Sequence, residues 1–166
     1  NIDLVKVPPQ PTAGLAPGLE RDLYPAGFDV LPDIVGLEDG TTSSVAGLDL
    51  GGCETSGPLT LRYRGFLLIE RTGVHTFALQ SLGGSRLRLG DLVLIDHDGP
   101  HWLSRKSRSA YLESGAYPFV LDYTTRADAP ELRLDVAPPG GELGPIGPGS
   151  LWRDAATASR GRAPLG

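Results

Sequence analysis

The stretch YRGFLLIERTGVHTFALQSLGGSRLRLGDLVLIDHDG, residues 63–99, decides the fold of this chain. Four short, largely apolar segments follow one another here, separated by glycine-containing groups of turn-forming residues. Short apolar or alternating segments bounded by such turns are typical of β-strands. The stretch therefore predicts an all-β protein, an antiparallel β-sandwich of the extracellular type with few or no helices.

The spacing of apolar residues indicates how these strands are connected. Residues 58–70 alternate leucine or tyrosine with threonine or arginine, which is the two-residue period of a half-buried strand. The Arg-Thr-Gly sequence at 71–73 predicts a hairpin turn, so that residues 74–81 pair with the strand before them. A second hairpin is expected from residues 85–89 and 92–95, which flank a Gly-Asp reverse turn.

The rest of the chain divides into one domain and two ends. Residues 1–17 contain four prolines without a sustained period, and residues 155–166 have no apolar period, so we expect linker or disordered segments there. The sandwich is expected to span residues 18–154. Within it, residues 97–108 are polar and predict a loop, whereas residues 109–125 predict two strands around a Ser-Gly turn.

Composition narrows the possible functions. Glycine and proline account for 38 of 166 residues (23 and 15), which suits many short strands better than helices. The formal net charge is -5, and lysine and arginine are scattered through the chain. A negative protein without a basic stretch repels phosphate backbones, which argues against nucleic acid as a partner.

The single cysteine, Cys53, lies in a small, glycine-rich segment, residues 41–57, that predicts a surface loop or weak strand. One cysteine cannot form an internal disulfide, so stability must come from the core. No apolar run approaches the roughly 18–20 residues that cross a bilayer, and no signal peptide precedes Asn1. If the protein is exported, its signal peptide has been removed. The sequence contains no methionine, even at position 1, which is typical of an excised segment or of a boundary within a longer chain.

The central stretch resembles the protective-antigen fourteen-kilodalton (PA14) domain, a module of secreted toxins, yeast adhesins, glycosidases and bacterial surface proteins. Near the N-terminus, Phe28, Leu31, Pro32 and Asp33 fit the Phe-x-x-Leu-Pro-Asp motif of that family. The resemblance implies a PA14-type β-sandwich. The matching positions of the central stretch are Tyr63, Gly65, Phe66, Leu68, Gly73, Thr76, Phe77, Leu79, Ser81 and the runs 84–87 and 96–99.

The resemblance also raises the question of calcium. Sugar-binding members of the family hold calcium with two adjacent aspartates in a Ser-Asp-Asp-Gly-Ser loop, and the equivalent segment here is Ser-Leu-Gly-Gly-Ser, residues 81–85. Leu82 and Gly83 carry no side-chain oxygen for a hard cation, so no cofactor is expected. Asp96 and Asp98 are weak alternative calcium ligands, but aspartates in such turns commonly accept hydrogen bonds from their own backbone.

Candidate ligand-binding residues cluster around the segment Asp-His-Asp-Gly-Pro-His-Trp at 96–102. An exposed indole such as Trp102 can stack on the apolar face of a sugar ring, whereas the strand aromatics are expected in the core. Arg105 begins a short basic tract that is either an acidic-glycan contact or a solvated loop. The full candidate set is Ser81, Ser85, Arg86, Asp96, His97, Asp98, His101, Trp102 and Arg105.

No catalytic arrangement emerges from the sequence. It has no Gly-x-Ser-x-Gly elbow and three histidines, of which His75 is expected simply to pack within a strand or face solvent. We therefore expect a noncatalytic glycan-binding or adhesion module of a larger secreted or cell-surface bacterial protein, which can be appended to an enzyme. The alternative is a protein-interaction or spacer module that has lost sugar binding. The expected location is extracellular, at the cell surface or periplasmic.

Overall fold

The computed structural model describes residues 3–4, 14–48 and 57–154, which fold as an antiparallel β-sandwich, confirming the predicted fold class. Two short 3-10 turns, η1 (Ile34–Gly36) and η2 (Pro148–Ser150), are the helical elements of these residues. No helix in the described part is long and apolar enough to cross a membrane. The strands are β1 (Asp3–Leu4), β2 (Leu15–Pro17), β3 (Leu19–Tyr24), β4 (Thr41–Val45), β5 (Leu59–Ile69), β6 (Gly73–Ser81), β7 (Gly84–Leu89), β8 (Leu92–His97), β9 (Ser104–Leu112), β10 (Gly115–Thr125), β11 (Leu132–Ala137), β12 (Gly144–Pro145) and β13 (Leu151–Asp154).

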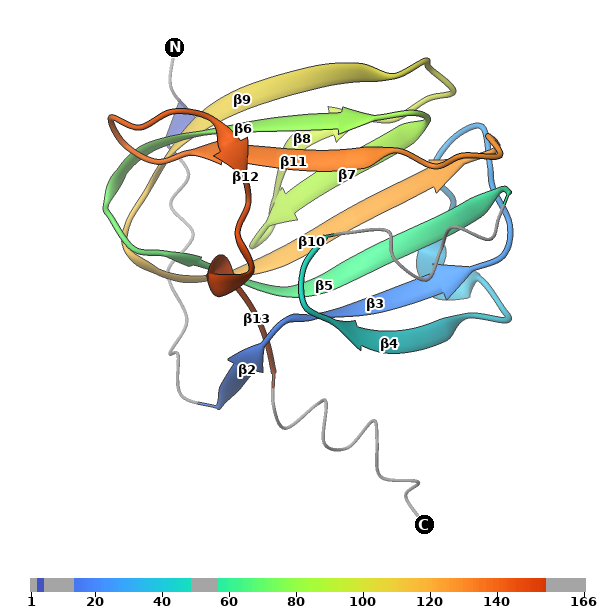
Figure 1. Cartoon of the computed structure of the whole chain (residues 1–166), viewed down its shortest axis with the longest axis horizontal. Helices are drawn as coiled ribbons and strands as arrows, with labels where there is room; N and C mark the ends of the chain where they lie inside the picture. The colour runs from blue at the N-terminus through green and yellow to red at the C-terminus, as the bar shows by residue number, and fades with distance from the viewer. Residues whose placement is uncertain (1–2, 5–13, 49–56, 155–166) are drawn as a thin grey trace.

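Two sheets pack face to face (Figure 1). One has the strand order β1-β9-β6-β11-β12, and the other has the order β2-β13-β5-β10-β7-β8. Strand β3 shares one edge of β5 with β13 and pairs on its other side with β4. The short β1 runs parallel to β9, whereas the other pairs of described strands are antiparallel.

Alternate residues of the long strands fill the space between the two sheets. Their side chains are buried and form a single hydrophobic cluster, as expected for a sandwich whose strands alternate inward and outward. The aromatics predicted to be core residues are buried except for Tyr111, which is partly exposed. Prominent members of the cluster are Leu61, Tyr63, Leu67, Phe77, Leu79, Leu87, Tyr117, Phe119, Leu121 and Tyr123.

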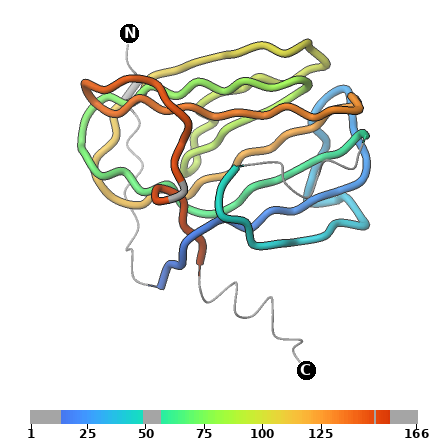
Figure 2. Tube along the Cα trace, viewed as in Figure 1, coloured from blue at the N-terminus to red at the C-terminus, as the bar shows by residue number. Residues whose placement is uncertain are grey.

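The predicted hairpin at residues 71–73 is wrong. Strand β5 pairs with β3, β10 and β13, whereas β6 pairs with β9 and β11 in the opposite sheet. The short connection therefore carries the chain across the sandwich, as the path in Figure 2 shows. The second predicted hairpin is confirmed, because β7 and β8 pair antiparallel with an irregularity between Leu87 and Arg88.

Other segments differ in extent from the sequence interpretation. The stretch predicted as a polar loop, residues 97–108, is strand from Ser104 onward, because β9 pairs along its whole length with the central strand β6. Within the expected N-terminal linker, β1 and β2 pair with β9 and β13. Cys53 and the expected C-terminal tail lie outside the described residues.

The outer face of the larger sheet carries a row of alternating charges. Asp22, Arg62, Asp122, Arg86 and Asp96 lie in register across β3, β5, β10, β7 and β8. Arg62 Nε lies 2.7 Å from Asp122 Oδ1, and Arg86 Nε lies 3.4 Å from Asp96 Oδ1. Opposite charges directly across strands stabilise a sheet, so this row of charges helps to hold the five strands that it crosses in register.

One outward arginine does not share this arrangement. Arg88 lies between Val120 of β10 and Val93 of β8, so both cross-strand neighbours are apolar. Its Nε is buried and has no hydrogen-bond partner among the described residues. A buried polar group without a partner costs free energy, which makes Arg88 a weak point of the sheet.

Candidate ligand-binding site

Segments from four parts of the chain form a pocket at one end of the sandwich, on the right in Figure 1. Strands β6 and β10 end here, and β7, β9 and β11 begin here. The pocket has a volume of about 260 Å³ and is open to solvent. It is lined by Phe28 and Asp29 after β3, Leu82 and Gly83 between β6 and β7, Pro100, His101 and Trp102 between β8 and β9, and Thr125, Arg126 and Ala127 at the end of β10.

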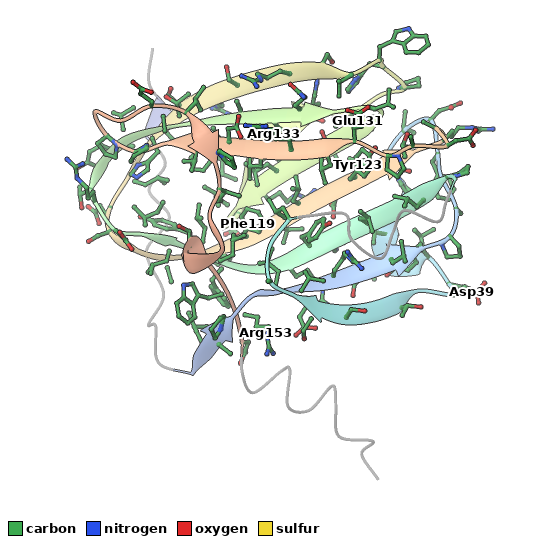
Figure 3. All side chains as sticks on the ribbon, in the orientation of Figure 1. Asp39, Phe119, Tyr123, Glu131, Arg133 and Arg153 are labelled. Carbon is green, nitrogen blue, oxygen red and sulfur yellow. The ribbon has the colours of Figure 1, made fainter. Side chains whose placement is uncertain are left out.

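The hydroxyl group of Tyr123 joins two of the loops at this end. It donates a hydrogen bond to the Leu82 carbonyl oxygen at 2.8 Å and accepts one from the Glu131 backbone N–H at 3.1 Å. Leu82 N donates directly to the Glu131 carbonyl oxygen at 3.0 Å, which completes the bridge. Figure 3 shows Tyr123 and Glu131 close together at this end of the sheet. A core tyrosine thus positions a pocket-lining residue, Leu82, through its polar tip.

Trp102 is the most exposed large apolar residue of the described chain, with 86% of its surface accessible. The neighbouring His101 contacts the backbone of this loop, because its Nε2 and Nδ1 lie 2.8 Å from the carbonyl oxygens of His97 and Trp102, and a neutral ring donates a hydrogen bond to one of these two oxygens. The imidazole rings of His97 and His101 stack with their centroids 4.0 Å apart. Burial lowers the pKa of His97, which keeps it neutral near pH 7. The indole is therefore presented from an internally bonded loop.

Asp96 near the end of β8 and Asp98 just after it stabilise the turn that follows this strand. Asp98 Oδ1 accepts hydrogen bonds from Leu31 N and Gly99 N, both at 2.8 Å, and Asp96 Oδ1 accepts one from Asp98 N at 3.4 Å. Arg86 lies 3.4 Å from Asp96 and 3.6 Å from Asp98. These contacts correspond to the turn-stabilising alternative for the two carboxylates. No group of three or more His, Cys, Asp or Glu side chains suited to a metal occurs among the described residues.

Three other candidate residues lie away from the pocket surface. Ser81 and Ser85 are fully buried, and their hydroxyl oxygens lie 2.8 Å apart, while Ser81 also donates to the Gly83 carbonyl oxygen. They shape the β6–β7 turn from beneath. Arg105 extends from β9 toward β11, where its guanidinium lies 3.7 Å from the buried Asp135. Of the nine candidate residues, His101 and Trp102 line the pocket, and neither these three nor Arg86, Asp96, His97 and Asp98 do.

Sequence reasoning missed two of the segments that build the pocket. Asp29 and Arg126 face each other across its rim, with Oδ1 and Nη1 3.7 Å apart, and both side chains are about two-thirds exposed. Phe28 is fixed by a hydrogen bond from its backbone N–H to Thr124 Oγ1 at 3.0 Å. The available signals were that Phe28 belongs to the motif shared with the family and that Arg126 directly follows a predicted strand. Neither signal indicates at which end of the sandwich these residues lie.

The loop between β6 and β7 has a backbone that disfavours an aspartate at position 83. Gly83 has a φ of 103°, in the region that favours glycine, and a Cβ there would lie 2.5 Å from the Thr124 carbonyl oxygen. Leu82 lines the pocket with an apolar side chain. In this conformation the loop offers a calcium ion neither carboxylate nor room for one at position 83.

The architecture defines the class of protein as an antiparallel β-sandwich module with a loop-built pocket at one end. A sequence profile of the PA14 domain matches residues 16–149, and the chain belongs to the PA14 domain family. No curated protein matches the chain.

Solved structures share this fold at low sequence identity. An anti-sigma factor domain-containing protein from Clostridium clariflavum is 17% identical with a TM-score of 0.70, over 91% of this chain and 52% of that one. A subtype-switched epithelial adhesin A domain from Candida glabrata, in complex with beta-lactose, is 13% identical with a TM-score of 0.69, over 95% and 96%. A PA14 sugar-binding domain from an RTX adhesin is 16% identical with a TM-score of 0.66, over 82% and 98%. The chain spans about half the length of the anti-sigma factor domain-containing proteins that it matches.

Proposed function

We propose that this PA14 domain is a noncatalytic carbohydrate-binding module that serves adhesion. The observation that carries the proposal is the exposed indole of Trp102 beside a pocket with a charged rim. An indole face stacks on the apolar face of a sugar ring, and rim groups such as Asp29 and Arg126 can exchange hydrogen bonds with its hydroxyls. Similar domains of known structure include an adhesin domain in complex with beta-lactose and a PA14 domain described as sugar-binding.

We further propose that glycan binding does not require calcium. The resemblance to sugar-binding members of the family implies that Leu82 and Gly83 replace the calcium-binding aspartates, and Asp96 and Asp98 are engaged in turns and in ion pairs with Arg86. Binding would then depend on stacking and on direct hydrogen bonds. This predicts equal glycan affinity and equal thermal stability in calcium and in EDTA.

The setting of the module follows from the same proposal. A glycan-binding adhesion domain acts where it meets glycans, so we place it in the extracellular space, at the cell surface or in the periplasm of a bacterium. It would be one part of a larger polypeptide whose neighbouring domains supply anchoring or enzymatic activity. Its partners would be glycans or glycosylated surface proteins.

A glycan array followed by calorimetric titration tests the proposal, with lactose in the panel. Trp102→Ala should weaken binding by about 2- to 12-fold, the equivalent of the roughly 0.5–1.5 kcal/mol that an aromatic stacking contact contributes. Leu103→Ala is the matched control, because Leu103 is the next exposed apolar residue of the same loop and does not line the pocket. Unchanged binding by the tryptophan variant would contradict the stacking role.

The missing carboxylates at positions 82 and 83 favour a second candidate, a protein-interaction or spacer module that has lost sugar binding. The array separates the two candidates. Binding to one glycan class, sensitive to Trp102→Ala, supports the lectin, whereas a silent array with a folded protein supports the interaction module.

A further inference from the structure

A second cavity of about 300 Å³ opens at the other end of the sandwich. It lies where β5 ends and β6 begins, on the left in Figure 1, whereas the glycan pocket lies where β6 ends. Its walls come from both sheets, with Leu67 and Ile69 of β5 opposite Val136 of β11. The cavity is thus the open mouth of the space between the sheets.

A buried imidazole projects into this mouth from the core face of β6. His75 alternates with the buried Phe77 and Leu79, is itself only 4% exposed, and lines the cavity. Its Nδ1 lies 3.1 Å from the Gly73 carbonyl oxygen. A carbonyl oxygen can only accept, so Nδ1 carries the proton and Nε2 of the neutral ring is an acceptor.

The acceptor nitrogen of His75 is free and accessible. Nε2 makes no hydrogen bond within the described chain, and it is not among the buried side-chain atoms that lack a partner. An atom that has no hydrogen-bond partner and is not buried must be accessible, so Nε2 belongs to the small part of the His75 side chain that reaches solvent. Burial lowers the pKa of His75, and the nearby Arg71 lowers it further, so the ring is neutral at pH 7.

The remaining lining defines what would fit. Leu67, Ile69, Val136 and Pro138 provide aliphatic walls, and Glu70, Arg71 and Ser150 add polar groups to the lining. No Phe, Tyr or Trp is present among the lining residues for a sugar to stack on. A cavity of about 150 Å³ is enough for benzene, so this one accommodates a single substituted ring. We propose that the cavity binds small apolar molecules that carry one hydroxyl group, of the phenol type, with the hydroxyl donating a hydrogen bond to His75 Nε2.

This assignment does not depend on the glycan proposal, because it concerns other residues at the opposite end of the domain. It makes a chemical prediction about selectivity. A ligand that fills the cavity covers this acceptor and removes it from water, so a ligand that donates to it is preferred over an isostere that leaves it without a hydrogen bond. The site should therefore discriminate p-cresol from toluene and 4-methylanisole, which have the same ring without a hydroxyl donor.

The test is a titration of the intact chain with these three probes, followed by two-dimensional NMR of the backbone amides and the imidazole nitrogens. We expect p-cresol to bind about 2- to 12-fold more tightly than either probe, the ratio that one neutral hydrogen bond of roughly 0.5–1.5 kcal/mol produces. The His75 Nε2 resonance should move with p-cresol alone. Equal affinities, no binding at millimolar concentrations, or shifts confined to residues near Trp102 would each overturn the proposal.

Two variants refine the test. His75→Phe keeps an apolar ring and removes the acceptor, so p-cresol should lose its advantage over toluene. Trp102→Ala alters the other end of the domain and should leave the affinity for p-cresol unchanged. The comparison of the three probes on the unmodified chain does not require either variant, so the proposal stays testable if His75→Phe fails to fold.

Discussion

The phenolic oxygen of Tyr123 offers the sharpest test of how the core supports the glycan pocket. Tyr123→Phe removes one atom and with it two hydrogen bonds, to the Leu82 carbonyl oxygen at 2.8 Å and from the Glu131 N–H at 3.1 Å. Neutral hydrogen bonds contribute roughly 0.5–1.5 kcal/mol each, so the variant should lose about 1–3 kcal/mol of unfolding free energy. Burial raises the pKa of Tyr123, which keeps the hydroxyl protonated and able to donate through neutral pH.

The loss is measured by urea unfolding, as a lower midpoint at constant slope. Tyr117→Phe is the matched control at the other end of β10, because that hydroxyl also makes two backbone hydrogen bonds, from Glu113 N at 2.9 Å and to Glu113 O at 2.7 Å. Both variants should lose similar stability, but only Tyr123→Phe should weaken glycan binding. A stability loss below about 0.5 kcal/mol, or equal effects of the two variants on binding, would refute the reasoning.

Three further predictions rest on single features of the structure. Arg88→Met should raise the unfolding free energy by about 1 kcal/mol in urea titrations because it removes an unpaired buried nitrogen, whereas Arg86→Met should lower it. Unfolding free energy should fall as pH drops below about 6.5, since the unfolded chain binds protons more readily than folded His75 and His97 do, and His75→Gln should reduce that slope to the part that His97 contributes. The double variant Leu82→Asp/Gly83→Asp should show no calcium-dependent thermal shift and should be less stable than the parent, because position 83 has a positive φ.

The part of the fold that depends on local patterns could be predicted from sequence. Strand positions and inward faces followed from the two-residue period, and the β7–β8 hairpin followed from its Gly-Asp turn. Whether β5 pairs with β6, which it does not, could not be judged in the same way. A short Gly-containing connection looks the same whether the chain folds back within one sheet or crosses to the other, and only the partners of both strands decide between these outcomes.

The same limit explains which site residues were found. His101 and Trp102 stood out because an exposed aromatic and an imidazole lie together in one polar segment. Phe28, Asp29 and Arg126 lie far from that segment in sequence and reach the pocket only because their strands end on the same side of the sandwich. Their side chains carry no local sign of that arrangement.

Aromatic residues also show where a correct burial prediction is incomplete. Tyr117 and Tyr123 were expected in the core, and their rings are buried there. They lie near opposite ends of β10, and each hydroxyl bonds to loop backbone at its own end, Glu113 at one and Leu82 with Glu131 at the other. Hydrophobic periodicity predicts only that the ring is buried. It does not predict that the hydroxyl group, through its hydrogen bonds, links the packing of the core to the conformation of the loops. Loop geometry at each end of this sandwich therefore depends on the core strand beneath it as well as on the loop's own sequence.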